Sequence, residues 1–438
     1  MELKPGYKQS DLGVIPEDWE ARRLRDVISA LLAGVSVNST AEDVGQGVPS
    51  ILKTSCVESG TFVPDEAKAI APKDRKRATL NPRRGSILIS RMNTIDLVGE
   101  CGFVDQDYPQ HFIPDRLWMT QFHSSSSVSS RWLAYLLSSA AYRRKLQLIA
   151  SGTSGSMKNI AKSSLLALQI VYPPPAEQHA ITNALSDVDA LITKLDQLIA
   201  KKRDIKRGAM QQLLTGKTRL PGFSGEWEVK RLGDITSLIR GGVYGEERPR
   251  PSLVAARVAT TAHIEMDDTW NDKEMGIRYF SREQIQHYSP IEGDLVVVKS
   301  SGSAASIQSG KIGYVSREEA GQFVFSNFLM LLRPLKGVPR FFYFYLSSHN
   351  VKKLIPSLVE ASTYPNIRIP EYLEIEIPVP PEAEQTAIAN VFSDMDAELA
   401  DLEARRDKTY AIKQGMMQEL LTGRIRLPVN PEPSEAVT

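Results

Sequence analysis

The apolar positions of the chain are most regular in a long stretch that occurs twice. Residues 173–221 align without a gap with residues 380–428 at an offset of 207, and 26 of the 49 aligned positions are identical. After a pair of prolines, each copy contains a long run without proline in which apolar residues recur at alternating steps of four and three. That spacing places one apolar stripe along an α-helix and is typical of a coiled-coil seam. The sequence therefore predicts two long helices, related by an internal duplication.

Each predicted helix needs a partner for its apolar stripe. The first runs from Glu177 to Leu214, which at 1.5 Å per residue gives a length of about 57 Å. We expect the two helices to pack on each other as an intramolecular coiled coil; the alternative is a surface helix that packs only on its own domain. The second seam is interrupted at Arg405 and Arg406 and is expected to resume at Ile412, Met416 and Leu420. The predicted seam residues are Ile181, Leu185, Val188, Ile192 and Leu195 in the first helix, and Ile388, Phe392, Met395, Leu399 and Leu402 in the second.

Two regions with mixed α and β patterns flank the first helix. In residues 16–172, the short apolar runs 86–90, 97–104 and 117–122 predict strands, 130–149 predicts a helix, and 165–172 predicts a last strand. Residues 222–379 repeat this order with little identity, which indicates a shared scaffold with divergent loops. We therefore expect a mixed α/β (α+β) fold with two similar globular domains. The predicted boundaries are 1–172 (first domain with its N-terminal segment), 173–221 (first helix), 222–379 (second domain), 380–423 (second helix) and 424–438 (disordered tail).

The amino-acid composition indicates the class of protein but does not identify a binding partner. The 438 residues are 42% hydrophobic and 24% charged, with a net charge of +1, which is ordinary for a globular protein. No apolar run approaches the ~20 residues that span a bilayer, and the polar N-terminus does not read as a signal peptide. Cys56 and Cys101 show no metal-ligand spacing and fit a reducing compartment. We expect a cytoplasmic protein without a membrane partner.

Catalytic motifs are nearly absent from the sequence. Asp65, Asp74 and Lys76 have the residue types of a metal-dependent nuclease, in which carboxylates hold Mg²⁺. They lie in a basic run, however, and loose patterns of this kind arise often by chance. The six scattered His residues offer no metal cluster, and no cofactor loop follows a strand. We expect no metal and no cofactor in this chain.

Polar and basic loops remain as candidates for nucleic-acid contact. Arg and Asn carry the paired donors and acceptors that match guanine and adenine edges, and clustered Lys and Arg suit phosphates. A solvated charge run, or turns that serve only structure, would explain the same residues. The candidate DNA contacts are Lys53, Thr54, Lys73, Arg75, Lys76, Arg77, Arg83, Arg84, Arg91, Asn93, Thr94, Lys158, Asn159, Arg257, Lys299, Ser300, Ser301, Tyr364, Asn366 and Arg368.

Three short motifs, two of them duplicated, occur in a specific order. They are residues 13–19, the Pro-Pro to Glu-Gln segments 173–178 and 380–385, and the Leu-Leu-Thr-Gly segments 213–216 and 420–423. Together they resemble the specificity subunit of a type I restriction–modification system, over nearly the whole chain. The arginines in the second seam depart from regular pairing. The family has no shared motif in its recognition loops, so no base contact is carried over.

The resemblance implies a function and a set of partners. Each globular domain would be a target-recognition domain for one half of a bipartite site in double-stranded DNA. The helices would form an antiparallel coiled coil, with pseudo-twofold symmetry, that sets the spacer and docks two methyltransferase subunits. Restriction subunits would join through these, and S-adenosylmethionine, ATP and Mg²⁺ would act in the partners. The nuclease, and a coiled-coil adaptor without DNA specificity, remain alternatives, and the sequence does not separate a restricting system from one that only methylates.

Overall fold

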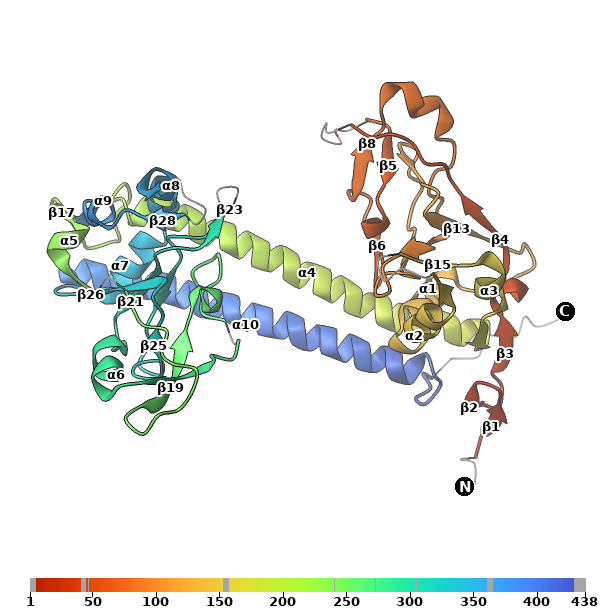
Figure 1. The fold of residues 1–438 in the computed structure, drawn as a ribbon. Helices are drawn as coiled ribbons and strands as arrows, with labels where there is room; N and C mark the ends of the chain where they lie inside the picture. Colours follow the sequence, from red (N-terminus) through yellow and green to blue (C-terminus); the bar gives the residue numbers. More distant parts are fainter. Residues whose placement is uncertain are drawn as a thin grey trace. The chain divides into compact units, whose positions relative to one another are not determined.

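The computed structural model describes residues 5–40, 45, 47–152, 157–239, 241–271, 273–303, 306–360 and 365–428. The chain forms two compact units, one made of residues 1–195 with 405–438 and the other of residues 196–404. Each unit combines one globular domain with parts of both long helices (Figure 1). The predicted fold class, two similar mixed α/β domains joined by two long helices, is confirmed.

The first domain is built on a six-stranded sheet against which α1 packs, and α2 packs on α1. A smaller sheet extends it, and the pair β3–β16 joins the beginning of the domain to its end. The main sheet has the order β4 (Ile28–Ala33), β13 (Leu117–Phe122), β9 (Ile87–Ser90), β11 (Cys101–Phe103), β7 (Gly60–Phe62) and β6 (Val57–Glu58). The other elements are β1 (Tyr7–Ser10), β2 (Gly13–Pro16), β3 (Glu20–Arg23), β5 (Ser50–Leu52), β8 (Ala67–Ala69), β12 (His111–Phe112), α1 (Ser130–Ser138), α2 (Ala140–Leu148), α3 (Lys162–Ala167) and β16 (Gln169–Tyr172).

The second domain repeats this plan with a shorter main sheet. Its four strands have the order β18 (Thr236–Ile239), β26 (Leu329–Pro334), β21 (Leu295–Val298) and β24 (Ile312–Tyr314). The pair β17–β29 takes the place of β3–β16. The remaining elements are β17 (Glu228–Arg231), α5 (Leu232–Ile235), β19 (Val254–Ala259), β20 (Ile277–Phe280), α6 (Arg282–Tyr288), β22 (Gly302–Ser303), β23 (Ser306–Ile307), β25 (Val324–Phe325), α7 (Pro339–Leu346), α8 (His349–Leu358), α9 (Ile369–Leu373) and β29 (Glu376–Val379).

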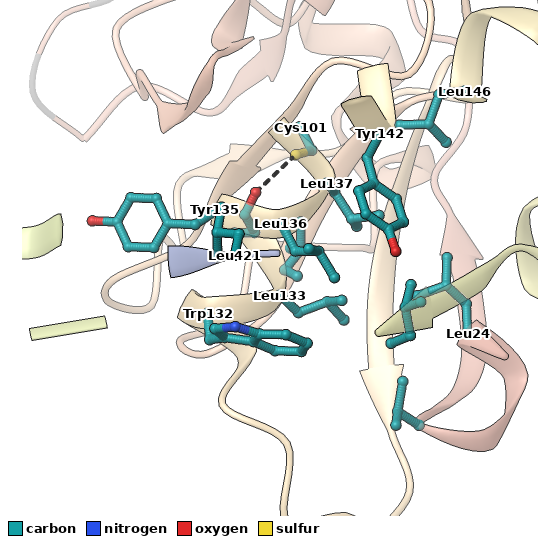
Figure 2. Close-up of a cluster of buried hydrophobic side chains, with 14 of the residues drawn as sticks. Leu24, Cys101, Trp132, Leu133, Tyr135, Leu136, Leu137, Tyr142, Leu146 and Leu421 are labelled. Carbon is teal, nitrogen blue, oxygen red and sulfur yellow. Dashed lines mark hydrogen bonds between the residues drawn. The ribbon is translucent and has the colours of Figure 1, made fainter. Parts of the chain in front are cut away.

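The core of the first domain forms where α1 meets the sheet. Trp132, Leu133, Leu136 and Leu137 of α1 are buried there, and Figure 2 shows Leu421 in the same cluster. Tyr135 of the same helix is also buried in this cluster, and its ring is directed away from the other labelled side chains (Figure 2). Since Leu421 follows the end of the second long helix, the core of the first domain is completed by the second copy of the repeat.

Three predicted elements have different bounds in the structure. The predicted strand 97–104 begins only at Cys101, because Thr94 O accepts from Leu97 N and Val98 N and closes a turn. The predicted helix 130–149 breaks at Ser139, whose backbone is extended with φ −65° and ψ 148°. The predicted strand 165–172 begins at Gln169, since the residues before it end α3.

The two long helices run antiparallel within each unit. α4 (Pro175–Leu213) and α10 (Glu382–Leu420) have 39 residues each, and α4 begins two residues before the predicted start. In one unit, Ile181 and Leu185 near the start of α4 share a core with Leu420 at the end of α10. In the other, Leu213 at the end of α4 shares a core with Phe392 near the start of α10.

The predicted seam is correct except in the last part of α10. Seven of its ten residues are buried, and Val188, Met395 and Leu402 are partly buried. Of the residues that were expected to resume the seam, Leu420 is buried and Met416 is partly buried. The prediction for Ile412 is wrong, because this side chain is 49% exposed. Thr409 and Lys413 occupy the seam instead, each 7% exposed.

A lysine is accommodated in the seam because its charge is paired. Lys413 Nζ lies 2.7 Å from Asp189 Oδ1, and Tyr135 OH donates to Asp189 Oδ2 at 2.6 Å. The other copy repeats the arrangement, with Lys206 bonded to Asp396. The two aromatic neighbours also correspond, because the Lys413 ammonium lies 5.6 Å from the Tyr135 ring and that of Lys206 lies 5.4 Å from the Phe344 ring. The duplication therefore extends to these ion pairs between the two long helices.

A buried carboxylate at the start of each long helix binds two distant segments; we call these groups the anchoring clusters. Glu177 of α4 is 1% exposed and accepts from Trp19 Nε1 at 2.7 Å. Arg426, which follows the end of α10, donates to both oxygens of Glu177 at 2.6 and 2.7 Å. These bonds raise the pKa of Arg426 further above its ordinary value. Trp19 opens the first domain, so the first cluster joins the start of the domain to both helices.

The second anchoring cluster is built from the corresponding residues. Glu384 of α10 is fully buried and accepts from Trp227 Nε1 at 3.1 Å. Arg219, which follows the end of α4, donates to its two oxygens at 2.5 and 2.6 Å. The sequence analysis predicted no role for Arg219 or Arg426, although the two arginines occupy equivalent positions in the two copies of the repeat.

The glutamine after each buried glutamate also has the same contacts in both copies. Gln178 Nε2 donates to Pro173 O at 2.8 Å, and its Oε1 accepts from Ser129 N at 2.8 Å, just ahead of α1. Gln385 donates to Pro380 O at 2.8 Å and accepts from Val338 N at 2.9 Å, just ahead of α7. The Glu-Gln pair therefore fixes how each long helix leaves its domain.

Replacement of Glu177 by Gln tests the anchoring cluster. The amide keeps the shape of the side chain but removes the buried charge partner of Arg426, which is left with its more exposed pair to Asp18. We expect a loss of about 1.5–3 kcal/mol in the free energy of unfolding, the range for hydrogen bonds to charged groups. The control is Glu20→Gln, since Glu20 is 59% exposed in its pair with Arg22 and should cost less than about 0.5 kcal/mol. Equal denaturation midpoints for the two variants would contradict the role of the cluster.

Two alanine variants of α10 test the corrected seam. Met417 is 4% exposed and Ile412 is 49% exposed. We expect Met417→Ala to lower the free energy of unfolding by about 2–5 kcal/mol and Ile412→Ala to change it by less than about 0.5 kcal/mol. Chemical denaturation of both variants measures the difference, and the reverse order would restore Ile412 to the seam.

Candidate nucleic-acid interface

A small antiparallel sheet in the first domain brings two of the predicted polar segments together. β10 (Met92–Asn93) follows the buried strand β9 and pairs with β15 (Lys158–Ile160), which also pairs with β14 (Ala150–Ser151). In this register Met92 lies opposite Asn159 and Asn93 lies opposite Lys158. Ile160 N donates to Arg91 O at 2.9 Å and closes the sheet. The candidates Arg91, Asn93, Thr94, Lys158 and Asn159 therefore converge on one edge of the domain.

The second domain brings its own candidates together by the same pairing. Ser300 pairs with Asn366 in an isolated bridge, and Ile367 N donates to Lys299 O at 2.9 Å. β28 (Asn366–Ile367) also pairs with β27 (Val359–Glu360), as β15 pairs with β14. The backbone therefore makes Arg91 equivalent to Lys299, and Asn159 equivalent to Asn366.

Several side chains at these two edges have unused hydrogen-bonding capacity. The Arg91 guanidinium lies 5.8 Å from the Trp118 ring, which holds it against the core. Within the described parts of the chain, Arg91 Nε, Asn159 Oδ1 and Arg368 Nε are buried without a hydrogen-bond partner. Native proteins seldom leave buried polar atoms unpaired, and such atoms mark places where water or a ligand completes the bonding. Arg368 is otherwise engaged, since it donates to Ser357 O at 2.5 Å.

The remaining candidates lie elsewhere in the two domains. Lys53 pairs with Glu66 at 3.3 Å, and bonds from Ser55 and Lys53 hold the pKa of Glu66 below its ordinary value. Thr54 begins the adjacent short turn, and Arg257 of β19 donates to Gln322 Oε1 at 3.0 Å. Tyr364 lies outside the described residues. The basic residues Lys73, Arg75, Lys76 and Arg77 belong to the 3₁₀ helix Pro72–Arg77, and Arg83 and Arg84 lie in the turn before β9.

The carboxylate considered for a nuclease organises the basic 3₁₀ helix. Asp74 Oδ2 accepts from Asn38 N at 2.9 Å and from Asn38 Nδ2 at 2.7 Å, and Asp74 Oδ1 accepts from Arg77 at 3.2 Å. The backbone bond from Asn38, with help from Arg77, lowers the pKa of Asp74. Among the residues that the structure describes, no group of three or more His, Cys, Asp or Glu side chains is placed to hold a metal ion. Asp74 is therefore explained by local structure.

Two further observations concern the chain as a whole. Both cysteines are buried, and burial raises the pKa of each thiol to about 12, so neither is a reactive thiolate. In the described ranges, no helix is both long and apolar enough to cross a membrane.

Comparison with known proteins places this architecture in one family. The model of the type I restriction modification DNA specificity domain matches twice, at residues 16–202 and 224–409. The MjaVIII specificity subunit of a type I restriction enzyme from Methanocaldococcus jannaschii is 22% identical, with 94% of each chain covered. A second protein of that organism, provisionally assigned as the MjaX specificity subunit, is 23% identical over 96% of this chain and 97% of its own length.

Solved structures show the same fold. The S subunit of a type I restriction-modification system from M. genitalium has a TM-score of 0.55 and 16% identity, covering 95% of this chain and 99% of the other. A chain from a study of complex assembly and conformational transition of the type I R-M system has a TM-score of 0.51 and 17% identity, with 94% and 99% covered. The chain belongs to the type I restriction–modification specificity family, and it is a specificity subunit that recognises DNA sequence, with two copies of the family domain.

Proposed function

We propose that each globular domain reads one half of a bipartite site in double-stranded DNA, and that the chain itself carries no catalytic activity. The observation that supports this most directly is the pair of equivalent polar edges. Arg91 and Asn93 of the first domain correspond to Lys299 and Ser301 of the second. One scaffold with different side chains at the same positions suits the recognition of two different short sequences.

The side chains at these edges have the chemistry of base and phosphate recognition. Arg contacts the O6 and N7 atoms of guanine, and Asn contacts the N6 and N7 atoms of adenine, each through two hydrogen bonds. Lys and Ser supply contacts to phosphates, which position a protein on the duplex without reading its sequence. We infer that the β10–β15 edge and its counterpart in the second domain face the grooves of DNA. Lys73, Arg75, Lys76, Arg77, Arg83 and Arg84 are proposed as phosphate contacts outside these edges.

The long helices are proposed to fix the gap between the half-sites. α4 leads from the first domain into the second as one unbroken helix of 39 residues. A stiff connection permits only one helical phase of DNA, and half-sites one turn apart are centred about 34–36 Å from each other. The fixed gap of the bipartite site would then be a property of the protein.

An exposed apolar stripe on α4 supports the docking of a methyltransferase subunit. Leu191, Leu198 and Ile205 recur at steps of seven, so they share one face of the helix, and they are 39%, 39% and 46% exposed. The equivalent residues of α10 are Glu398, Arg405 and Ile412. Because two of these three are charged, the apolar stripe is a feature of α4 and is not repeated on α10. We propose that two methyltransferase subunits bind the helices, one of them on this stripe, and that restriction subunits join through them. S-adenosylmethionine, ATP and Mg²⁺ would serve these partners.

Substitution of Asn93 tests the recognition edge. We expect the complex with methyltransferase subunits to select two half-sites from a library of random duplexes. Asn93→Ala should weaken the preference at one half-site by about 1–3 kcal/mol, the contribution of a two-bond base contact. The other half-site should be unchanged. Lys230→Ala, which alters an exposed pair with Glu228, is the control and should preserve both halves. Equal loss at both half-sites would contradict separate reading, and selection of no sequence would favour the adaptor.

Polar substitutions on the stripe test the docking proposal. Leu198→Gln combined with Ile205→Gln should weaken binding of the methyltransferase subunit about tenfold or more, which corresponds to at least 1.4 kcal/mol. The fold should be retained, because both side chains are exposed. Val229→Gln, at a position that is 63% exposed in β17, serves as the control. An unchanged affinity, measured by titration of purified methyltransferase subunit, would remove the stripe from the interface.

A further inference from the structure

The loop that carries the polar edge is closed by the same backbone pattern in both domains. We call residues 91–98, and residues 299–303 with 306–309, the two reading loops, a name that rests on the proposed function. In the first domain Gly99 N donates to Ser90 O at 2.7 Å, and Ser90 N donates to Glu100 O at 2.7 Å. In the second, Gly310 N donates to Val298 O and Val298 N donates to Lys311 O, both at 2.8 Å. The loop ends are therefore equivalent residue by residue.

A helix packs directly on the base of each reading loop. Gly99 and Gly310 have φ of +79° and +84°, which few other residues adopt. A Cβ on Gly99 would lie 2.9 Å from Leu146 of α2, and one on Gly310 would lie 2.7 Å from Ile355 of α8. The helices α2 and α8 thus occupy the same place against the two loops.

On α2, Arg143 binds two carbonyl groups of the first reading loop and a carboxylate just beyond its end. Its guanidinium donates to Val98 O at 2.9 Å and to Asp96 O at 2.8 Å, both within the loop. It also pairs with Glu100 at 3.0 Å, and the two side chains are 11% and 12% exposed. Glu100 accepts in turn from Ser59 N at 2.8 Å. Arg143 therefore fixes the backbone that follows Asn93 and Thr94.

On α8, Lys352 lies at the equivalent position against the second loop. Lys352 precedes Ile355 by three residues, as Arg143 precedes Leu146. Its ammonium donates to Gly310 O at 2.7 Å and pairs with Asp268 Oδ1 at 2.6 Å. Asp268 Oδ1 also accepts from Ile312 N at 2.8 Å, so the ion pair is tied to the strand that leaves the loop.

The carboxylate partner comes from a different segment in each domain. The residue equivalent to Glu100 in the second domain is Lys311, whose ammonium donates instead to Thr261 O and Ile264 O at 3.0 and 2.5 Å. In the second domain, the carboxylate that pairs with the cation of the helix is that of Asp268. Asp268 has a positive φ of +70°, and Ser59, whose N–H binds Glu100 in the first domain, has a positive φ of +50°. Burial raises the pKa of Asp268, and Lys352 opposes the rise. The cation on the helix has been kept while its acid partner has changed place.

We propose that Arg143 and Lys352 are positioning residues that hold the two reading loops in place, so that each governs recognition of one half-site. Neither side chain needs to touch DNA. A cation that is retained while its carboxylate moves indicates that the required contact is the one between the cation and the carbonyls at the base of the loop. The strength of each half-site preference then depends on a residue of the helix behind the loop.

Replacement of Arg143 or Lys352 by methionine tests the proposal. The experiment uses the complex of the full chain with its methyltransferase subunits. We expect Arg143→Met to reduce selectivity at one half-site about tenfold, comparable to the effect of one mismatched base pair, and to leave the other half-site intact. Lys352→Met should do the same at the opposite half-site. The readout is the sequence profile selected from random duplexes, which separates the two halves within one molecule.

The chain supplies its own controls for this experiment. Arg144 and Lys353 are the exposed neighbours of Arg143 and Lys352 on the same helices, so Arg144→Met and Lys353→Met should leave both half-sites unchanged. Arg143→Lys and Lys352→Arg exchange the cations that the two domains use and should restore most of the selectivity. Should Arg143→Met fail to fold, Arg143→Gln, which keeps a polar side chain at this position but is shorter and uncharged, should affect the same half-site.

The possible outcomes separate the two proposals. A wild-type complex that selects no bipartite site would overturn the proposed function itself. Suppose instead that the wild-type complex reads both half-sites. If Arg143→Met is then as selective as the wild type, or is weakened equally at both half-sites, only the positioning role is overturned. Failure of Arg143→Lys to restore selectivity would also overturn it, because a second cation at that position should reach the same carbonyls.

Discussion

The buried carboxylates Glu177 and Glu384 are the constraint on which the rest of the structure depends. A buried charge is costly unless it is paired and hydrogen-bonded, and each of these glutamates is satisfied by a tryptophan and an arginine from distant parts of the chain. The tryptophan opens a domain, the glutamate begins one long helix, and the arginine follows the end of the other. Each domain is therefore complete only when the C-terminal end of the other copy's long helix packs on it. This dependence explains why both halves of the chain contain the tryptophan, the glutamate and the arginine.

Around this fixed frame, the two domains differ where DNA recognition is proposed. The pairs β3–β16 and β17–β29, the core helices α1 and α7, and the Glu-Gln contacts are repeated. The reading loops have different side chains, and even the acid behind them moves from Glu100 to Asp268. The repeated frame allows such changes because most side chains of the reading loops, apart from Val98, lie outside the core. The two reading loops can then diverge without loss of the fold of either domain.

The sequence predicted the parts that depend on local periodicity. The seam from Ile181 to Leu195 was correct because a repeat of three and four residues specifies one helix face. Ile412 was wrong because hydrophobicity alone does not reveal that Lys413 is neutralised by Asp189. Arg219 and Arg426 were missed because their glutamate partners lie far away in the chain, although their identity at the repeat offset was a usable signal. The convergence of Arg91 and Asn93 with Asn159 depends on a pairing between distant strands, which periodicity does not specify. The DNA contacts themselves stay predictions.

The central claim, that one chain specifies a split site through two separate domains, is tested most directly by a genome-wide map of methylated adenines in cells with and without the gene. The account predicts that a single motif disappears with the gene, and that this motif consists of two short half-sites around a gap of constant length. Methylation that is unchanged in a host whose methyltransferase is active, or the loss of a continuous motif without a gap, would contradict it.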